Sequence, residues 1–254
     1  MKKLDKQRVE ALIEALKELT PSQFMWLERT IKVLQYPHQY SILQSDLFDE
    51  DTLCVFGDAL RIHHSFSVEP FSKDKFEFVL EKVVNMSSKT AVLAPKGNPG
   101  HDITIDNVPI SLKTQANRDI HEDLIWISKF MELGKGKWGD DPEDMKTLLH
   151  LFLEHMKKYE RILMLRTLQK TPVWIYELVE VPKTLLLKAE SGSLEMMNDS
   201  RQYPKPGYCY VKEGDKTIFS LYFDGGSERK LQVKNLMKSY CFVHARWEFT
   251  IPEA

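Results

Sequence analysis

Cysteine is scarce in this chain, and its placement argues against two kinds of site. Three cysteines occur among 254 residues, Cys54, Cys209 and Cys241, and none belongs to a CxxC pair. Zinc sites and disulfide frameworks need closely spaced or paired cysteines. Neither is indicated, so we expect reduced cysteines in the core of a cytoplasmic protein.

Long apolar runs and long Pro/Gly/Ser tracts are also missing. No stretch approaches the ~20 apolar residues that span a bilayer. The basic start of the chain leads into a Glu-containing amphipathic pattern instead of the apolar region of a signal peptide. With 43% hydrophobic and 28% charged residues, the composition is typical of a globular protein. We therefore expect a chain that folds throughout, is not exported and has no membrane partner.

A strong basic excess is absent as well, because the formal net charge is −2. Nucleic-acid-binding proteins commonly carry a basic excess or a basic stripe. An enzyme with acidic metal ligands can nevertheless concentrate lysine and arginine in a cleft, where the total charge does not reveal them. The net charge therefore counts only mildly against a nucleic-acid partner.

Periodicity divides the chain into a helical part and a strand-rich part. We expect one elaborated domain over residues 1–254, with a helical part at 1–70, a core at 71–180 and a β-rich part at 181–254. Apolar residues at helical spacing predict helices at 4–19, 22–35, 51–65, 73–85, 119–133 and 142–158, and a short one after Pro182. Strands are predicted at 162–165, 173–179, 208–212, 217–223 and 241–250, with a polar loop at 191–207.

The central feature is residues 100–115, which read GHDITIDNVPISLKTQ. Two short apolar-alternating runs meet at an Asp-Asn turn, and this predicts a β-hairpin. The first run carries Asp102 and the second carries Lys113. Side chains alternate along a strand, so Ser111 and Lys113 share a face. An acid and a lysine on adjacent strands are usually solvated surface groups, so the pair alone does not decide the function.

The helix predicted at 73–85 carries two more acids, Glu77 and Glu81. Four residues apart, they share one helix face and could both approach a metal held by the hairpin. The ordinary alternative is a pair of solvated charges. Asp106 is a weaker candidate, because the hairpin turn should carry it away from the site.

The order of these features resembles the PD-(D/E)xK nuclease superfamily, and within it type II restriction endonucleases and the mismatch-repair nicking enzyme MutH. A helix with Val79-Leu-Glu81 precedes a loop, then the run with Asp102, then Ile110-Ser-Leu-Lys-Thr114. In that superfamily the last strand usually supplies an acid two residues before the lysine. This chain has Ser111 there. The resemblance spans residues 71–115.

The resemblance implies an α/β fold with a central mixed sheet flanked by helices, and Mg²⁺-dependent hydrolysis of double-stranded DNA at a short specific sequence. Asp102 and Glu81 would bind Mg²⁺, with Glu77 as a reserve ligand and Ser111 bonded to a metal-bound water. Lys113 would position the attacking water. A cognate DNA methyltransferase outside this chain is implied, and a homodimer is one possible assembly. A catalytically inactive DNA-binding protein and a nicking or repair endonuclease are the alternatives left open.

Three polar segments are candidates for contacting DNA. The side chains that follow the Asp224-Gly-Gly turn suit base edges and phosphates, although a charged edge strand is an equally good interpretation. A competing set lies in the polar loop, and a lysine-bearing turn at 134–138 could meet phosphates. The three sets are Arg229, Lys230, Gln232, Lys234 and Asn235; Asn198, Arg201 and Gln202; and Lys135 and Lys137.

Overall fold

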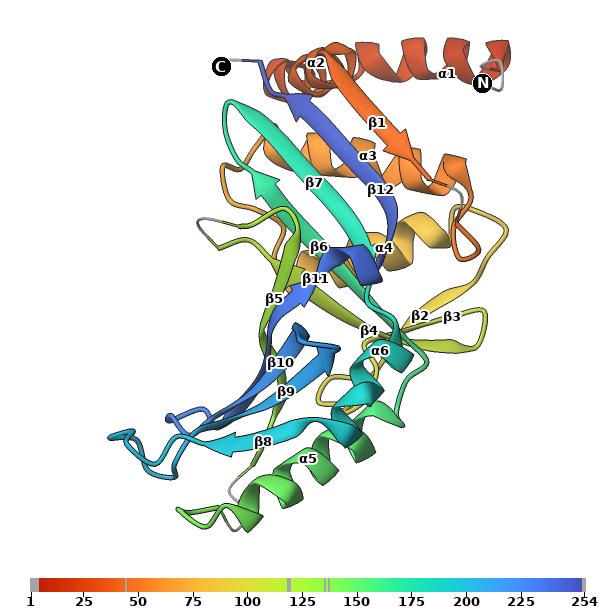
Figure 1. The fold of residues 1–254 in the computed structure, drawn as a ribbon. Helices are drawn as coiled ribbons and strands as arrows, with labels where there is room; N and C mark the ends of the chain where they lie inside the picture. Colours follow the sequence, from red (N-terminus) through yellow and green to blue (C-terminus); the bar gives the residue numbers. More distant parts are fainter. Residues whose placement is uncertain (1–4, 44, 118–119, 135, 137, 253–254) are drawn as a thin grey trace.

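The computed structural model describes residues 5–43, 45–117, 120–134, 136 and 138–252. These residues form two β-sheets with helices packed against them (Figure 1). The predicted α/β class is confirmed. Lys135 and Lys137 lie outside the described residues.

The larger sheet has seven strands in the order β1-β12-β7-β6-β4-β3-β2. Strands β4 and β6 run parallel, and the other neighbours run antiparallel, so the central sheet is mixed as predicted. Its strands are β1 (His38–Ile42), β2 (Ala91–Leu93), β3 (Ile103–Ile105), β4 (Val108–Gln115), β6 (Arg161–Gln169), β7 (Val173–Glu180) and β12 (Phe242–Thr250).

The predicted hairpin is confirmed in β3 and β4. Asp106 and Asn107 have φ of 47° and 67°, which is the left-handed pair that a tight hairpin turn requires. Ile103 pairs with Ile110, and both side chains are fully buried. The turn therefore fixes the register that places Asp102 beside β4.

Four helices precede or cover the larger sheet. They are α1 (Lys6–Lys17), α2 (Pro21–Gln35), α3 (Glu50–His64) and α4 (Lys73–Val84), close to the predicted bounds. Ser72 caps α4 by accepting a hydrogen bond from the Lys75 amide, as a serine at this position predicts. Phe56 of α3 and Phe76 of α4 meet edge to face at 5.9 Å, and Phe56 also contacts Trp247 of β12. These contacts anchor α4, which carries the acidic candidates, to the sheet.

The smaller sheet has five strands in the order β5-β11-β10-β9-β8. One face of this sheet packs against α5 (Glu143–Met156) and α6 (Lys183–Leu187), and the buried side chains between them form an apolar cluster. The strands are β5 (Leu124–Glu132), β8 (Ser193–Met196), β9 (Gly207–Glu213), β10 (Lys216–Asp224) and β11 (Lys230–Met237); two single turns, η1 (Lys188–Ser191) and η2 (Lys238–Tyr240), complete the chain order.

The helix predicted at 119–133 is wrong, because this region forms strand β5. Ile125 and Ile127 are buried while Trp126 between them is 40% exposed, which is strand periodicity. The alternation then fails at a bulge: Val233 pairs with Ile127, but Leu231 pairs with Met131. The two extra residues in β5 change the spacing of its apolar residues from the alternation of a strand to a spacing close to that of a helix. This explains the wrong prediction.

Three further strands differ from the sequence prediction. The expected polar loop contains β8, and the short strands β1 and β2 were not predicted. Both β1 and β2 lie at edges of the larger sheet and are too short for a clear periodic pattern. The β-rich carboxy-terminal region also divides, since β12 joins the larger sheet and β8 to β11 join the smaller one.

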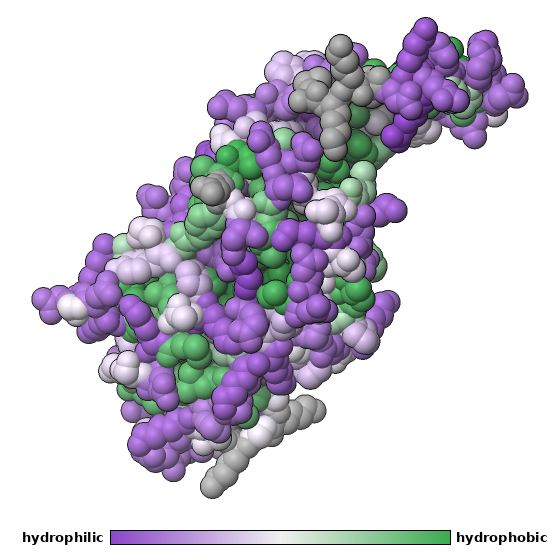
Figure 2. Space-filling model, turned by 90° about the vertical axis from the view of Figure 1, so that its right-hand side faces the viewer, coloured by the Kyte–Doolittle hydropathy of each residue, from purple (hydrophilic) through white to green (hydrophobic). Residues whose placement is uncertain are grey.

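The surface is mainly polar on the face shown in Figure 2, with apolar side chains visible between charged ones. Among the described residues, no helix has the length and apolar character needed to cross a membrane.

Candidate active site

Asp102 lies directly before β3 and is held by the neighbouring strand. Its Oδ2 accepts hydrogen bonds from the Leu112 amide at 2.6 Å and from the Ser111 hydroxyl at 3.2 Å. Its own amide donates to the Ile110 carbonyl at 2.9 Å. The carboxylate is therefore fixed in orientation by β4, and its other oxygen, Oδ1, accepts a hydrogen bond from Lys73.

Lys73, in the first turn of α4, occupies the space in front of Asp102. Its Nζ lies 2.7 Å from Oδ1 of Asp102 and 3.2 Å from Oε1 of Glu77. Burial lowers the pKa of Lys73, but the two carboxylates raise it by more, so the net pKa is above the usual value. The ammonium group thus serves as the counter-ion for both acids.

Lys113 extends from β4 into the same region and has a different environment. Burial lowers its pKa to about 8, although the negative charge of Asp102 opposes this shift. Its Nζ lies 5.4 Å from the centroid of the Phe130 ring, which belongs to the bulged part of β5. A lysine with a pKa near neutrality can exchange a proton, which an ordinary surface lysine rarely does.

Two hollows open beside these side chains, and Lys73 lines both. One, of about 380 Å³, is lined by Lys113, Thr114 and residues of the β5 bulge. The other, of about 600 Å³, is lined by Glu77, Asp102, His101 and the loop from Leu93 to Asn98. Lys113 therefore borders one hollow, Glu77 and Asp102 border the other, and Lys73 borders both.

The two helix acids have different contacts. Oε1 of Glu81 accepts a hydrogen bond from the Leu93 amide at 2.9 Å, so this carboxylate ties α4 to β2. Glu77 instead shares Lys73 with Asp102. Asp106, at the far end of β3, accepts a hydrogen bond from the Thr90 amide. These contacts bring Glu77, more than Glu81, into association with Asp102; which acid binds metal stays a prediction.

Ser111 is fully buried, and its hydroxyl supports Asp102. Within the part of the chain that the structure describes, no three His, Cys, Asp or Glu side chains gather in a group that could hold a metal. The available donors are the carboxylates of Asp102 and Glu77, and Mg²⁺ commonly uses one or two carboxylates and completes its shell with water.

The smaller sheet presents a polar and aromatic face on the side away from α5. Gln232 of β11 is nearly buried: its Oε1 accepts from Nε1 of Trp126 at 3.1 Å, and its Nε2 donates to Oδ2 of Asp224 at 3.1 Å. Nζ of Lys234 lies 3.8 Å from the centroid of the Tyr222 ring. This face thus offers aromatic rings and, beside them, the partly exposed cation of Lys234.

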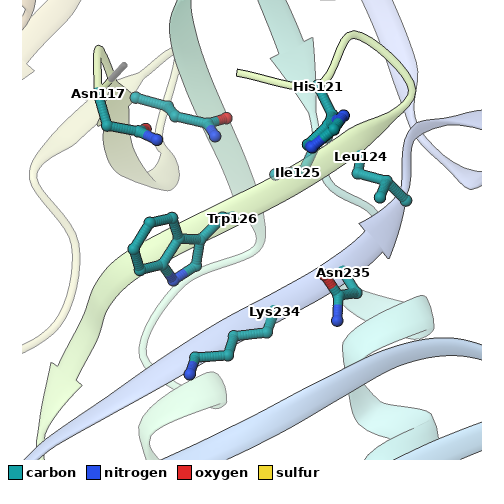
Figure 3. A pocket seen from close by; sticks show the side chains of 8 residues that line it. Asn117, His121, Leu124, Ile125, Trp126, Lys234 and Asn235 are labelled. Atoms are coloured by element: carbon teal, nitrogen blue, oxygen red, sulfur yellow. The ribbon is translucent and has the colours of Figure 1, made fainter. Parts of the chain in front are cut away.

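A pocket of about 270 Å³ lies where this face meets the end of β4. Trp126 of β5 and Lys234 and Asn235 of β11 line it, with Asn117 and His121 also in its wall (Figure 3). The guanidinium of buried Arg166, which also pairs with Glu177, donates to the carbonyls of His121 and Leu124, both at 2.8 Å. The larger sheet therefore holds the start of β5 in place.

The two competing recognition segments are adjacent in space. A Cβ on Gly225 would lie 2.0 Å from the carbonyl oxygen of Pro204, and one on Gly226 would lie 3.6 Å from Nε2 of Gln202. The turn before β11 therefore packs directly on the loop before β9. Within these segments, Asn198 and Arg201 are exposed, Arg229 has a φ of 40°, and Lys230 pairs with Glu228 at 3.0 Å.

Sequence reasoning did not identify Lys73, Trp126, Asn117 or His121. The spacing of Lys73 and Glu77 at the start of a capped helix was an available signal. Trp126 was missed because its segment was predicted to be a helix, and the helix pattern did not indicate that its side chain faces solvent. No local pattern marks Asn117 or His121, because the pocket forms only where two sheets meet.

Comparison with known proteins identifies the family of this chain. Residues 12–249 match the SmaI family, described as type II site-specific deoxyribonuclease. Over 225 residues the chain is 44% identical to the type II restriction enzyme SmaI of Serratia marcescens, which covers 87% of this chain and 89% of that protein. No solved structure shows a significant match. This chain therefore belongs to the SmaI family of type II restriction endonucleases and is a site-specific deoxyribonuclease.

Proposed function

We propose that this enzyme cleaves both strands of double-stranded DNA in a Mg²⁺-dependent reaction at the site formed by Asp102, Glu77, Lys73 and Lys113. The observation that carries the proposal is the shared cation: two carboxylates from different elements converge on one ammonium group. Mg²⁺ sites in phosphoryl chemistry commonly use one or two protein carboxylates, so this pair is sufficient. We infer that the chain belongs to the PD-(D/E)xK superfamily with Ser111 in place of the usual second acid.

The residues present fit a divalent ion. Oδ1 of Asp102 and Oε1 of Glu77 already share a positive charge, and Oδ2 of Asp102 is fixed by β4. When bound, Mg²⁺ polarises the phosphodiester and lowers the pKa of a coordinated water. Glu81 is the alternative ligand, but it would have to give up its hydrogen bond to the Leu93 amide.

The lysines have separate roles in this proposal. Lys113 orients the attacking water and stabilises the charge that develops on the phosphate, because it borders the hollow beside Lys73 and the β5 bulge. Lys73 balances the carboxylates in the free protein. A metal held by these carboxylates would displace its ammonium group, which would then be available to pair with a phosphate oxygen.

The exposed face of the smaller sheet is proposed to contact the DNA. Trp126 lines the pocket on the smaller sheet, and Ser128, two residues later on β5, lines the hollow beside Lys113. A DNA duplex whose reacting phosphate lies at Lys113 would therefore be close to the smaller sheet. The proposed contact surface also includes Lys234 and Asn235, and the two adjoining segments that carry Arg229 and Arg201. Asn198, Gln202, Lys230 and Gln232 complete the proposed recognition set, with Lys135 and Lys137 as proposed phosphate contacts.

Two partners follow from this function. A cognate methyltransferase would protect the host's own sites, without direct contact with this chain. A second copy of the enzyme would supply an active site for the opposite strand.

The direct test is digestion of unmethylated plasmid and genomic DNA of known sequence. We expect discrete fragments with Mg²⁺ and none with EDTA. Sequencing the ends gives the recognition site and the cleavage position. Nicked circles as the final product would overturn double-strand cleavage, and binding without cutting under all metal conditions would overturn the proposed chemistry.

A further inference from the structure

The pocket of about 270 Å³ beside Trp126 has no part in the chemistry proposed for Asp102 and Lys113. The described residues that line it carry carboxamide, imidazole, indole and aliphatic side chains and one ammonium group. Pockets that hold drug-sized ligands measure about 300–1,000 Å³, so this one has room for a single small ring system. A nucleobase is the small planar group that a deoxyribonuclease meets in its substrate.

Trp126 contributes its ring, and not its N–H group, to this pocket. Its side chain is 40% exposed, although tryptophan is highly buried on average. Nε1 donates to Oε1 of Gln232 at 3.1 Å, and tryptophan has no other polar group with which to read the edge of a base. The ring, which lies between Asn117 and Lys234 in Figure 3, can instead stack on the face of a base. Neighbouring bases cover those faces in a duplex, so the ring suits a base that has left the stack.

A bulge in β11 brings two polar side chains to this ring. Between Val233 and Leu236, β11 has one residue more than the segment of β5 with which it pairs. Neighbouring side chains of a regular strand point to opposite faces, yet Lys234 and Asn235 both line the pocket. Asn235 has a φ of 53°, a left-handed conformation that asparagine adopts more readily than most residues. The bulge therefore supplies a carboxamide that can bond a base edge and a cation that suits a phosphate.

Another part of the wall is held by a buried cation. Arg166 of β6 is fully buried, and its Nε donates to Oε1 of Gln115 at 2.9 Å. The same guanidinium donates to the carbonyls of His121 and Leu124, both at 2.8 Å. Gln115, His121 and Leu124 all line the pocket. A pocket whose walls are ordered before binding loses little conformational freedom when its ligand enters.

The pocket is also close to the hollow that Lys113 lines, and this step rests on the proposed function. Trp126 lines the pocket, and Ser128 lines the hollow. Residues two apart on a strand are separated by about 7 Å. One strand of a DNA duplex advances ~3.4 Å for each nucleotide. A base in the pocket would therefore belong to a nucleotide within a few steps of the phosphate at Lys113.

We propose that this pocket binds one nucleobase of the target site, rotated out of the duplex and stacked on Trp126. Asn235 hydrogen-bonds the edge of this base, and Lys234 pairs with the phosphate of the same nucleotide. The enzyme thus selects one position of its site by admitting a base to a cavity, while Arg229 and Arg201 read bases that stay in the stack. Rotating a base out of the duplex requires that it be unpaired, and the cost is smallest when the base has no partner.

Removing the partner of each base in turn tests the proposal in the native enzyme. Selection of duplexes bound in Ca²⁺ from a random pool gives the site without any need for cleavage. The probes are duplexes of that site, each with one abasic nucleotide, and fluorescence anisotropy in Ca²⁺ gives their affinities. We expect about tenfold tighter binding where the base opposite the gap enters the pocket, and equal or weaker binding elsewhere. Tighter binding at no position would overturn the proposal.

Variants of Trp126 test whether this pocket is the receptor. Trp126→Ala should abolish the tighter binding, whereas Trp126→Phe should retain it, because it keeps a ring and loses only the bond to Gln232. Phe242→Ala is the matched control, since Phe242 of β12 is an aromatic side chain with 41% exposure. Tighter binding that survives in Trp126→Ala would place the base elsewhere. Equal loss in Trp126→Phe and Trp126→Ala would show a structural role through Gln232 and would also overturn stacking.

Asn235→Gly tests the reading of the base edge. Glycine adopts a positive φ without strain, so the bulge should persist while the carboxamide is lost. We expect the preference for the cognate base to fall several-fold at the position found with the abasic probes and to stay unchanged at the others. An unchanged preference there would contradict the role of Asn235. A native enzyme that shows the abasic effect but does not cut with Mg²⁺ would contradict the proposed function alone, so the two failures are distinguishable.

Discussion

The ammonium group of Lys73 lies 2.7 Å from Oδ1 of Asp102, while Oδ2 of the same carboxylate accepts the Leu112 amide at 2.6 Å. One oxygen of Asp102 is thus bonded to the neighbouring strand and the other to the ammonium group of a lysine side chain. Because Lys73 also reaches Glu77, it balances in the free enzyme the charge that a metal would balance in the active one. If a metal binds Asp102 and Glu77 as proposed, it must displace the ammonium group of Lys73, so metal binding would be coupled to the position of this one side chain.

We predict that Lys73→Met increases the affinity of the DNA-free enzyme for Mg²⁺ or Ca²⁺, by roughly tenfold, which corresponds to ~1.4 kcal/mol. The variant should also melt at a lower temperature without metal, because Asp102 and Glu77 lose their common counter-ion. Isothermal titration calorimetry and thermal melts with and without Ca²⁺ measure both effects. Lys75→Met is the matched control, since Lys75 is exposed on the same helix turn. Equal metal affinity in native and Lys73→Met enzyme would contradict the coupling.

Lys113→Ala should abolish cleavage while leaving folding and most specific DNA binding intact. The expected loss in the single-turnover rate is about 10²–10⁴-fold, the range for a positioned proton-transfer group. Asp102→Ala should lose activity similarly, with an added loss of metal binding. Lys146→Ala, which removes an exposed lysine of α5 that pairs with Glu143, is the control. A Lys113→Ala enzyme that cuts at the native rate would remove the hairpin from the active site.

Substitution of the two acids of α4 should have different effects, because Glu77 and Glu81 have different contacts. Glu77→Gln is expected to reduce activity and metal affinity, because Glu77 shares its cation with Asp102. Glu81→Gln keeps an oxygen that can accept the Leu93 amide, so it should preserve folding and most activity. Sequence reasoning gave the opposite order, with Glu81 as the principal ligand. Metal titrations of both variants decide between the two assignments, and a larger loss in Glu81→Gln would favour the sequence-based one.

Acid should destabilise the protein through His64. Burial lowers its pKa to about 4, and its ring stacks on Trp174 at 3.6 Å and lies 2.7 Å from the Tyr176 hydroxyl. Between pH 6.5 and 4 the unfolded chain binds a proton that the folded protein does not, so stability rises with pH in this window and is lost as pH falls. The full effect is of the order of 3 kcal/mol. Urea denaturation of native and His64→Gln enzyme from pH 4 to 8 should show a flatter dependence in the variant; parallel curves would argue against this assignment.

The hairpin and the acids of α4 could be predicted from sequence because their signals are local. The Asp106-Asn107 turn, the Ser72 cap and the apolar stripe of α4 each arise within a few residues. Lys73 is different, since its role depends on the distance between a helix and a hairpin that the sequence leaves undefined.

The smaller sheet was harder to predict for the same reason. Its strand β5 comes from the middle of the chain and pairs with β11, more than ninety residues later. The bulge in β5 breaks the alternation that would have identified it. The pocket at Trp126 forms only when those distant segments meet, and the buried Arg166 that holds the start of β5 has no local signature.

The final prediction concerns sequence recognition by the two adjoining segments. Arg229→Ala and Arg201→Ala should each weaken binding of the cognate duplex more than binding of a scrambled one, since an arginine that reads a base contributes ~1–3 kcal/mol of discrimination. Gln232→Ala should also lower discrimination, but through the loss of its bonds to Trp126 and Asp224.

Lys234→Ala should instead weaken binding to both duplexes and reduce the salt dependence, as expected for a phosphate contact. Lys216→Ala, at the exposed start of β10, is the control. Fluorescence anisotropy with Ca²⁺ at several salt concentrations gives both affinities. Because Gly225 packs on Pro204, the segments form one surface, and we expect both arginine variants to lose discrimination. Loss in Arg201→Ala alone would confine recognition to the loop before β9, and unchanged discrimination in both arginine variants would move it away from this surface.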